Sequence, residues 1–141
     1  RMDANRPIMI VDDDEVDLMS VKRAFAELRI TNDLIVAQGG QAAVDMINQE
    51  EMPRRALVLL DLRMPGVDGL EVLRTIRNSD VYGTVPVIIL TTSNEERDKI
   101  ATYELGVSGY IVKPVDYHQF VEVVRTINLY WTLSQQPGDT A

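Results

Sequence analysis

Ionisable and hydroxyl side chains follow four short segments of this chain that are mostly apolar. They are Asp12 and Asp13 after residues 7–11, Asp61 after residues 56–60, Thr91 after residues 85–90, and Lys113 after residues 108–112. Short, continuous apolar segments are typical of strands that are buried on both faces. Because such a strand gives no packing reason for an acid at the next position, these side chains are candidates for chemistry.

A metal ion would relieve the repulsion among the three aspartates if their carboxylates lie close together. Carboxylates that lie close together repel one another and resist ionisation. A hard divalent cation such as Mg²⁺ removes that conflict, because it prefers oxygen ligands. A carboxylate beside the metal can also act as a nucleophile toward phosphorus. Lys113 and Thr91 could then bind oxygens of the transferring group and neutralise its charge.

The elements that must position these groups alternate along the chain. Residues 34–37 complete a set of five predicted strands. Amphipathic patterns predict five helices, over about residues 16–28, 41–48, 69–77, 95–105 and 117–133, with Asp68 or Gly69, Ser93 or Asn94, and Asp116 at the starts of the last three. Strands that alternate with helices indicate a parallel sheet that is covered on both faces. Ligands bind such sheets beyond the carboxyl ends of the strands.

The composition of the chain argues against several classes of site and partner. The chain has 141 residues, no cysteine, one histidine and a formal net charge of −8. We expect one domain over residues 7–133, with flexible ends at residues 1–6 and 134–141. The missing cysteines exclude thiolate metal sites and disulfides. The acidic balance argues against nucleic-acid binding. We find no secretory leader and no apolar run of membrane length, and therefore expect a cytoplasmic protein without membrane contacts.

Four segments together resemble the receiver domain of two-component response regulators. They are residues 10–13 (IVDD), 60–69 (LDLRMPGVDG), 86–92 (PVIILTT) and 109–114 (GYIVKP). The resemblance spans residues 7 to about 128. It implies a flavodoxin-like (βα)5 fold with a parallel sheet of strand order 2-1-3-4-5.

The resemblance also implies a role for individual residues. Asp61 would be the phosphoacceptor. Mg²⁺, or Mn²⁺ in its place, would be held by Asp12, Asp13, Asp61 and the backbone carbonyl of Arg63. Thr91 and Lys113 would bind the phosphoryl group, and Thr91 and Tyr110 would form the conformational switch. The peptide bond before Pro114 is usually cis in this family. We expect the Arg63 side chain either to pair with the acidic cluster or to screen the phosphate.

The last predicted helix carries an apolar stripe of Phe120, Val124, Ile127 and Trp131. The helix is longer than a five-stranded sheet requires, so we expect its aromatic end to overhang the domain. This predicts a homodimer surface that includes Tyr110, Phe120, Tyr130 and Trp131. The alternative is that the helix folds back on its own domain. The aromatic extension also resembles single-domain regulators of phytochrome-type kinases.

The resulting functional hypothesis is a stand-alone phosphoacceptor rather than an enzyme. Its expected partners are a sensor histidine kinase and a histidine phosphotransfer protein. One alternative is a phosphate-independent adaptor. Another is a Mg²⁺-dependent aspartyl-phosphate phosphatase, which usually has a second acid where Arg63 stands here. A flavin-binding module is a further alternative, but the acidic segment after residue 11 would repel its phosphate.

Overall fold

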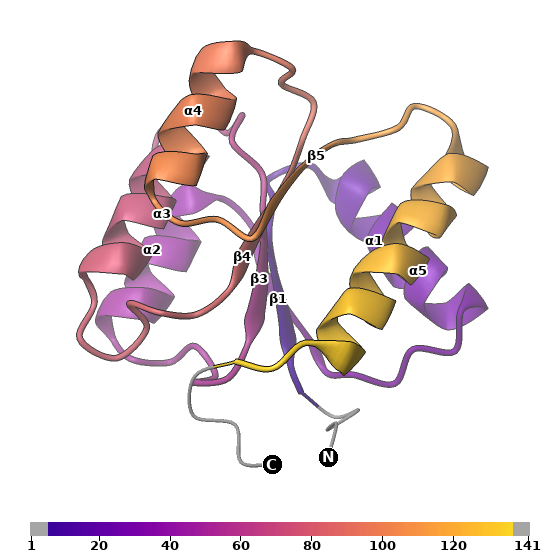
Figure 1. Cartoon of the computed structure of the whole chain (residues 1–141), viewed down its shortest axis with the longest axis horizontal. Helices are drawn as coiled ribbons and strands as arrows, with labels where there is room; N and C mark the ends of the chain where they lie inside the picture. The colour runs from indigo at the N-terminus through magenta and orange to yellow at the C-terminus, as the bar shows by residue number, and fades with distance from the viewer. Residues whose placement is uncertain (1–5, 137–141) are drawn as a thin grey trace.

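The computed structural model describes residues 6–136, which form a five-stranded parallel sheet with five helices (Figure 1). The strands are β1 (Ile8–Val11), β2 (Leu34–Ala37), β3 (Leu57–Leu60), β4 (Val87–Thr91) and β5 (Gly109–Val112). The helices are α1 (Glu15–Glu27), α2 (Gly40–Asn48), α3 (Gly69–Asn78), α4 (Glu96–Glu104) and α5 (Tyr117–Leu133). The strand order is β2-β1-β3-β4-β5, so the predicted fold is confirmed.

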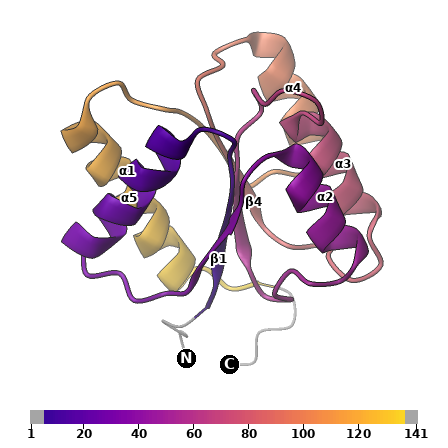
Figure 2. The same cartoon turned by 180° about the vertical axis from the view of Figure 1, so that it is seen from behind.

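The helices cover both faces of the sheet. Helices α1 and α5 lie on one face, and α2, α3 and α4 lie on the other (Figures 1 and 2). Each face has its own apolar core, and alternate residues of the same strands enter each one. Met9 and Leu60 belong to the α2–α3 side, whereas Ile10 and Leu59 belong to the α1–α5 side. This alternation explains why the central strands are apolar throughout.

Capping residues were predicted for three helices. The predictions for α3 and α5 are confirmed, and the prediction for α4 is wrong. The carboxylates of Asp68 and Asp116 accept from backbone N–H groups in the first turns of α3 and α5. At α4, neither Ser93 nor Asn94 is the cap. The cap position is held by Glu95, whose side chain makes no capping bond. The Ser93 hydroxyl instead accepts from the Glu95 N–H, one residue before the helix, so that prediction was wrong.

The exposure predicted for the last helix was wrong at two positions. Phe120 and Trp131 are buried, with Trp131 only 2% exposed, and both belong to the core that α1 and α5 form with the sheet. Helix α5 therefore folds back on its own domain, and the partly exposed Tyr130 is the aromatic residue of its end that reaches solvent. Within residues 6–136, no helix is both long enough and apolar enough to span a membrane.

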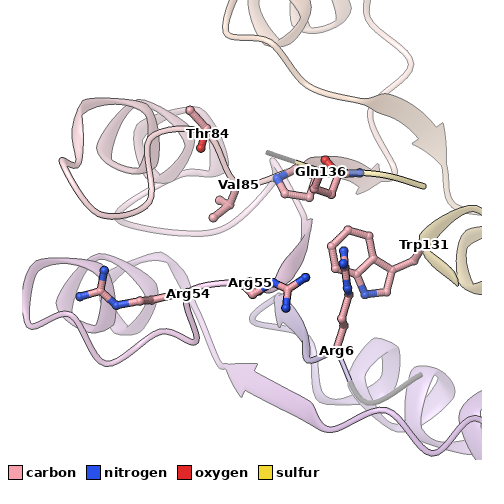
Figure 3. A pocket seen from close by; sticks show the side chains of 8 residues that line it. Arg6, Arg54, Arg55, Thr84, Val85, Trp131 and Gln136 are labelled. Atoms are coloured by element: carbon pink, nitrogen blue, oxygen red, sulfur yellow. The ribbon is translucent and has the colours of Figure 1, made fainter. Parts of the chain in front are cut away.

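Trp131 lies under the amino ends of the strands. Its ring is stacked against Arg6, whose guanidinium carbon lies 5.3 Å from the ring centroid (Figure 3). Arg6 is itself buried, so it belongs to the folded domain and not to the predicted flexible N-terminus. The other residues predicted to be flexible at that end, 1–5, and the tail residues 137–141 lie outside the described part of the chain.

Candidate metal and phosphoacceptor site

Strand register brings two of the aspartates together. Val11 pairs with Leu60, so Asp12 and Asp61 leave the sheet side by side from β1 and β3. The backbone N–H of Asp61 donates to the Val11 carbonyl at 3.0 Å and keeps this alignment one residue beyond the paired strands. The pairing of Val11 with Leu60 thereby places the carboxylates of Asp12 and Asp61 next to each other.

Close packing behind Asp61 depends on Gly69, at the start of α3. A Cβ atom at this position would lie 2.1 Å from the Asp61 carbonyl oxygen and 2.6 Å from the Leu62 Cα atom. Both distances are too short for any side chain. The absence of a side chain at residue 69 therefore allows the first turn of α3 to pack against the backbone of the phosphoacceptor candidate.

Asp12, Asp13 and Asp61 form one carboxylate cluster. One oxygen from each lies within 4.8 Å of the others. Asp12 and Asp61 are buried, at 1% and 6% exposure, and Asp13 is half-buried. Burial raises the pKa of Asp12 to about 6, although the hydrogen bond from Lys113 acts in the opposite direction. A hard divalent cation fits this all-oxygen donor set, because it would neutralise carboxylates that are kept from water.

Lys113 reaches the same cluster from beyond β5. Its ammonium donates to Asp12 Oδ2 at 2.7 Å and to Asp17 Oδ2 at 2.6 Å, and it lies 3.5 Å from Asp61 Oδ2. Burial by itself lowers the pKa of Lys113. The hydrogen bonds to Asp12 and Asp17 and the charge of Asp61 outweigh that effect, so the pKa lies above its usual value. Lys113 therefore stays charged inside the site.

Thr91 and Tyr110 are linked through one residue of the loop after β4. Thr91 is fully buried, and its hydroxyl accepts from the Ser93 N–H at 3.3 Å. The Tyr110 hydroxyl donates to the Ser93 carbonyl at 2.9 Å. Burial raises the pKa of the Tyr110 hydroxyl, so it remains a proton donor at neutral pH. The two predicted switch residues thus share a partner but make no direct hydrogen bond in the described chain.

The Arg63 side chain points away from the acidic segment that follows β1. Its backbone N–H donates to Asp61 Oδ1 at 3.3 Å, whereas its side chain turns toward α4. The guanidinium donates to Ser93 Oγ, Glu95 and Asp98. Pairing with the acidic segment after β1 was therefore a wrong prediction. The Arg63 side chain instead joins the loop after β3 to the start of α4.

Two residues in or near the site have contacts that the sequence did not suggest. Asp17, on α1, pairs with Lys113, and Asp14, which had no assigned role, caps α1 by accepting from the Val16 N–H at 2.8 Å. The signal for Asp17 was present but weak, since it is the last of five acids in residues 12–17. The described residues contain no cis peptide bond, so the bond before Pro114 is trans here, unlike the bond that is usual in the family that the sequence resembles.

Comparison with known proteins places the chain in a family. Residues 8–125 match the response regulator receiver domain. The chain is 37% identical to a probable methanogenesis regulatory protein, FilR2, of Methanothrix harundinacea, over 93% of this chain and 87% of that protein. It is 36% identical to the response regulator Rcp1 of Synechocystis, over 88% of this chain and 87% of that protein.

Solved structures agree with this placement. The phosphorylated cyanobacterial phytochrome response regulator RcpA superimposes with a TM-score of 0.87 at 29% identity, over 95% of this chain and 99% of that one. The Mn²⁺-bound form of Rcp1 superimposes with a TM-score of 0.84 at 34% identity, over 94% and 99%. The sheet order, the clustered aspartates and these matches lead to one conclusion: the chain belongs to the response regulator receiver family.

Proposed function

We propose that this protein accepts a phosphoryl group from a histidine kinase onto Asp61 in a Mg²⁺-dependent reaction and then signals through a changed protein–protein surface. The observation that carries the proposal is the convergence of three carboxylates and one buried ammonium at the carboxyl ends of β1, β3 and β5. The protein acts as a phosphoacceptor in this scheme, not as an enzyme on a separate substrate.

The metal would be held by carboxylate oxygens of Asp12, Asp13 and Asp61, together with the backbone carbonyl of Arg63. When bound, Mg²⁺ neutralises charge on the carboxylates and on phosphoryl oxygens. Rcp1 was solved in a Mn²⁺-bound form. Because Mn²⁺ and Mg²⁺ have similar ligand preferences, that form supports a divalent cation at the corresponding position of this chain.

In the transfer step, a carboxylate oxygen of Asp61 attacks the phosphorus of the kinase's phosphohistidine. The new O–P bond forms as the P–N bond breaks, and the electron pair of that bond returns to the imidazole nitrogen. Lys113 and the Thr91 hydroxyl bind two of the phosphoryl oxygens, where charge builds up. RcpA, the first of the structural relatives above, was solved in its phosphorylated form, and this supports the step.

The switch would run through α4. Thr102 is the residue of this helix that is buried, so α4 has little apolar anchorage. Arg63 holds its first turn, and Arg77 donates to the Leu105 carbonyl just after its last turn, at 2.7 Å. If Thr91 moves to bind a phosphoryl oxygen, its bond with the Ser93 N–H is disturbed, and Ser93 also contacts Arg63 and Tyr110.

Exposed apolar side chains beside the site support a protein partner. Val16 and Met19 of α1 are 69% and 68% exposed, and Val115, after β5, is fully exposed. Val16 and Val115 line a depression of about 160 Å³ that also reaches Lys113. Exposed apolar groups are typical of contact surfaces, and a kinase or phosphotransfer protein bound here would bring its phosphohistidine to Asp61.

Homodimerisation remains part of the proposal. After the burial of Phe120 and Trp131 is taken into account, the aromatic candidates for such a surface are Tyr110 and Tyr130, which are both partly exposed. We expect the dimer to use β5 and α5, the two elements that carry these tyrosines. Sedimentation of the phosphorylated and unphosphorylated protein tests this, and a one-chain mass in both states would contradict it.

The direct test is intact mass after incubation with acetyl phosphate and Mg²⁺. We expect one added phosphoryl group on the wild type, and none on Asp61→Asn or in EDTA. Asp14→Asn is the matched control, because an asparagine still caps α1 and the carboxylate of Asp14 lies outside the metal cluster. A wild-type protein that binds Mg²⁺ but gains no mass would favour the phosphate-independent adaptor instead.

A further inference from the structure

The acids that follow Asp13 have three different sets of contacts. Asp14 caps α1, and the Glu15 carboxylate accepts a long bond of 3.5 Å from Gln38. Asp17 alone among these three hydrogen-bonds to Lys113 within the described residues. The proposed phosphoryl transfer uses Lys113 but gives Asp17 no role, so its contact with the lysine requires an explanation.

Lys113 is bonded to two carboxylates and lies near a third. Its distances to Asp17 and Asp12, 2.6 and 2.7 Å, are those of charge-assisted hydrogen bonds. The distance to Asp61 Oδ2 is 3.5 Å, which is too long for such a bond. In the unphosphorylated protein, therefore, the ammonium lies beside the phosphoacceptor oxygen without being bonded to it.

The two bonded carboxylates differ in how easily they release the lysine. The Asp12 side chain is 2% exposed, so it would become a buried charge without its partner. The Asp17 side chain is 32% exposed, so water replaces the ammonium at little loss. When phosphoryl oxygens on Asp61 compete for Lys113, the hydrogen bond between Lys113 and Asp17 is therefore the one that breaks.

We propose that Asp17 is a positioning residue that holds Lys113 away from Asp61 before phosphorylation and competes with the phosphoryl group for it afterwards. The second half of this inference rests on the proposed function of Asp61, whereas the first half concerns the resting protein alone. Asp17 thereby lowers the stability of the phosphorylated state. A shift of Lys113 toward Asp61 requires the loss of one charge-assisted hydrogen bond.

The first test needs no phosphorylation. Crystal structures of Asp17→Asn and of Glu15→Gln are compared without metal or phosphoryl mimic. Both changes remove one negative charge from α1, but only the first replaces a charged partner of Lys113 by a neutral amide, which binds an ammonium more weakly. We expect the distance from Lys113 Nζ to Asp61 Oδ2 to shorten from 3.5 Å into hydrogen-bond range in Asp17→Asn and to stay long in Glu15→Gln. A lysine that stays in place in Asp17→Asn would overturn the proposal.

The second test uses beryllofluoride with Mg²⁺, a non-covalent mimic of a phosphoryl group on a carboxylate. We expect Asp17→Asn to bind the mimic about fivefold more tightly than the wild type, the effect of losing one partly exposed competing ion pair. Glu15→Gln should change the affinity by less than about twofold. Calorimetric titration measures all three proteins.

Two results of this titration would contradict the proposal. An equal gain in both variants would mean that only the overall charge matters. Weaker binding to Asp17→Asn would mean that Asp17 directs Lys113 toward the phosphoryl group. A wild type that binds Mg²⁺ but no mimic would contradict the proposed function of Asp61. In that case the Lys113 distance in the two crystal structures still decides whether Asp17 restrains the lysine.

Discussion

The amino ends of the strands are closed by large buried aromatic side chains, whereas the carboxyl ends are lined by ionisable groups. At the amino ends, Trp131 covers one face, and Tyr82 covers the other with its hydroxyl bonded to the Met52 carbonyl at 2.6 Å. At the carboxyl ends, Asp12 and Asp61 are equally shielded from water but carry charges that repel.

This difference separates the source of stability from the source of function. Burying aromatic area at the amino ends stabilises the fold. Burying carboxylates at the carboxyl ends destabilises it until a cation or a proton neutralises them. Four measurements test this contrast between the two ends of the same sheet.

The largest effect is expected at the amino ends. Trp131→Ala should lower the free energy of unfolding by about 3–5 kcal/mol, because it removes a large buried ring and leaves a cavity. Urea unfolding measures the loss. Leu129→Ala, on the exposed side of the same helix, is the control and should change stability by less than about 0.5 kcal/mol. A similar loss in both variants would show that the end of α5 does not depend on the buried indole.

The second effect is expected at the carboxyl ends on adding metal. Mg²⁺ at a concentration 100 times its Kd should raise the free energy of unfolding by about 2.7 kcal/mol, because it binds the folded state only. Thermal unfolding with Mg²⁺ and with EDTA measures the gain. Asp13→Asn should lose most of the gain, whereas Trp131→Ala should keep it. Equal stabilisation of wild type and Asp13→Asn would place the metal elsewhere.

The third effect concerns pH in the absence of metal. Because the pKa of Asp12 is raised to about 6 in the folded protein, its protonated form favours folding. The stability that Asp12 contributes is complete below about pH 4 and is lost as the pH rises through about 6. The difference in unfolding free energy between wild type and Asp12→Asn, measured in EDTA from pH 4 to 7, should follow this course. A difference that is constant with pH would contradict it.

The smallest effect is expected from Arg63, whose side chain is 44% exposed. Arg63→Ala should lower the free energy of unfolding by less than about 1 kcal/mol, because exposed ion pairs contribute little. Hydrogen exchange should nevertheless become faster in the first turn of α4, which loses its link to the loop after β3. Arg97→Ala removes another ion pair of Glu95 and should leave that exchange unchanged. Equal exchange in both variants would mean that Arg63 does not hold α4.

Local patterns in the sequence predicted most of the fold. Short segments rich in apolar residues marked all five strands. Asp68 and Asp116 marked two helix starts, because a cap is a bond between near neighbours. The same logic failed at α4, where the Ser93 hydroxyl is drawn into bonds with Arg63 and Asp98. A contact between residues 30 positions apart leaves no local signal.

In the candidate site, the sequence predicted which carboxylates meet but not all of the side chains that contact them. Asp12, Asp13 and Asp61 were expected together, because parallel strands present their carboxyl ends at one edge, and the structure brings them together. The direction of the Arg63 side chain and the bond of Asp17 were not predicted. Arginine and lysine side chains are long enough to reach several acidic partners. Which partner they bind depends on where the neighbouring helices lie.

The alternation of strands and helices and the chemical character of each strand end follow from side-chain type and spacing along the chain. The burial of Trp131 in its own domain and the closer approach of Lys113 to Asp17 than to Asp61 depend instead on how the elements pack. Exposure and hydrogen-bond choice are set by which surfaces meet, and residues 17 and 113 meet only when α1 and β5 have packed on the same sheet.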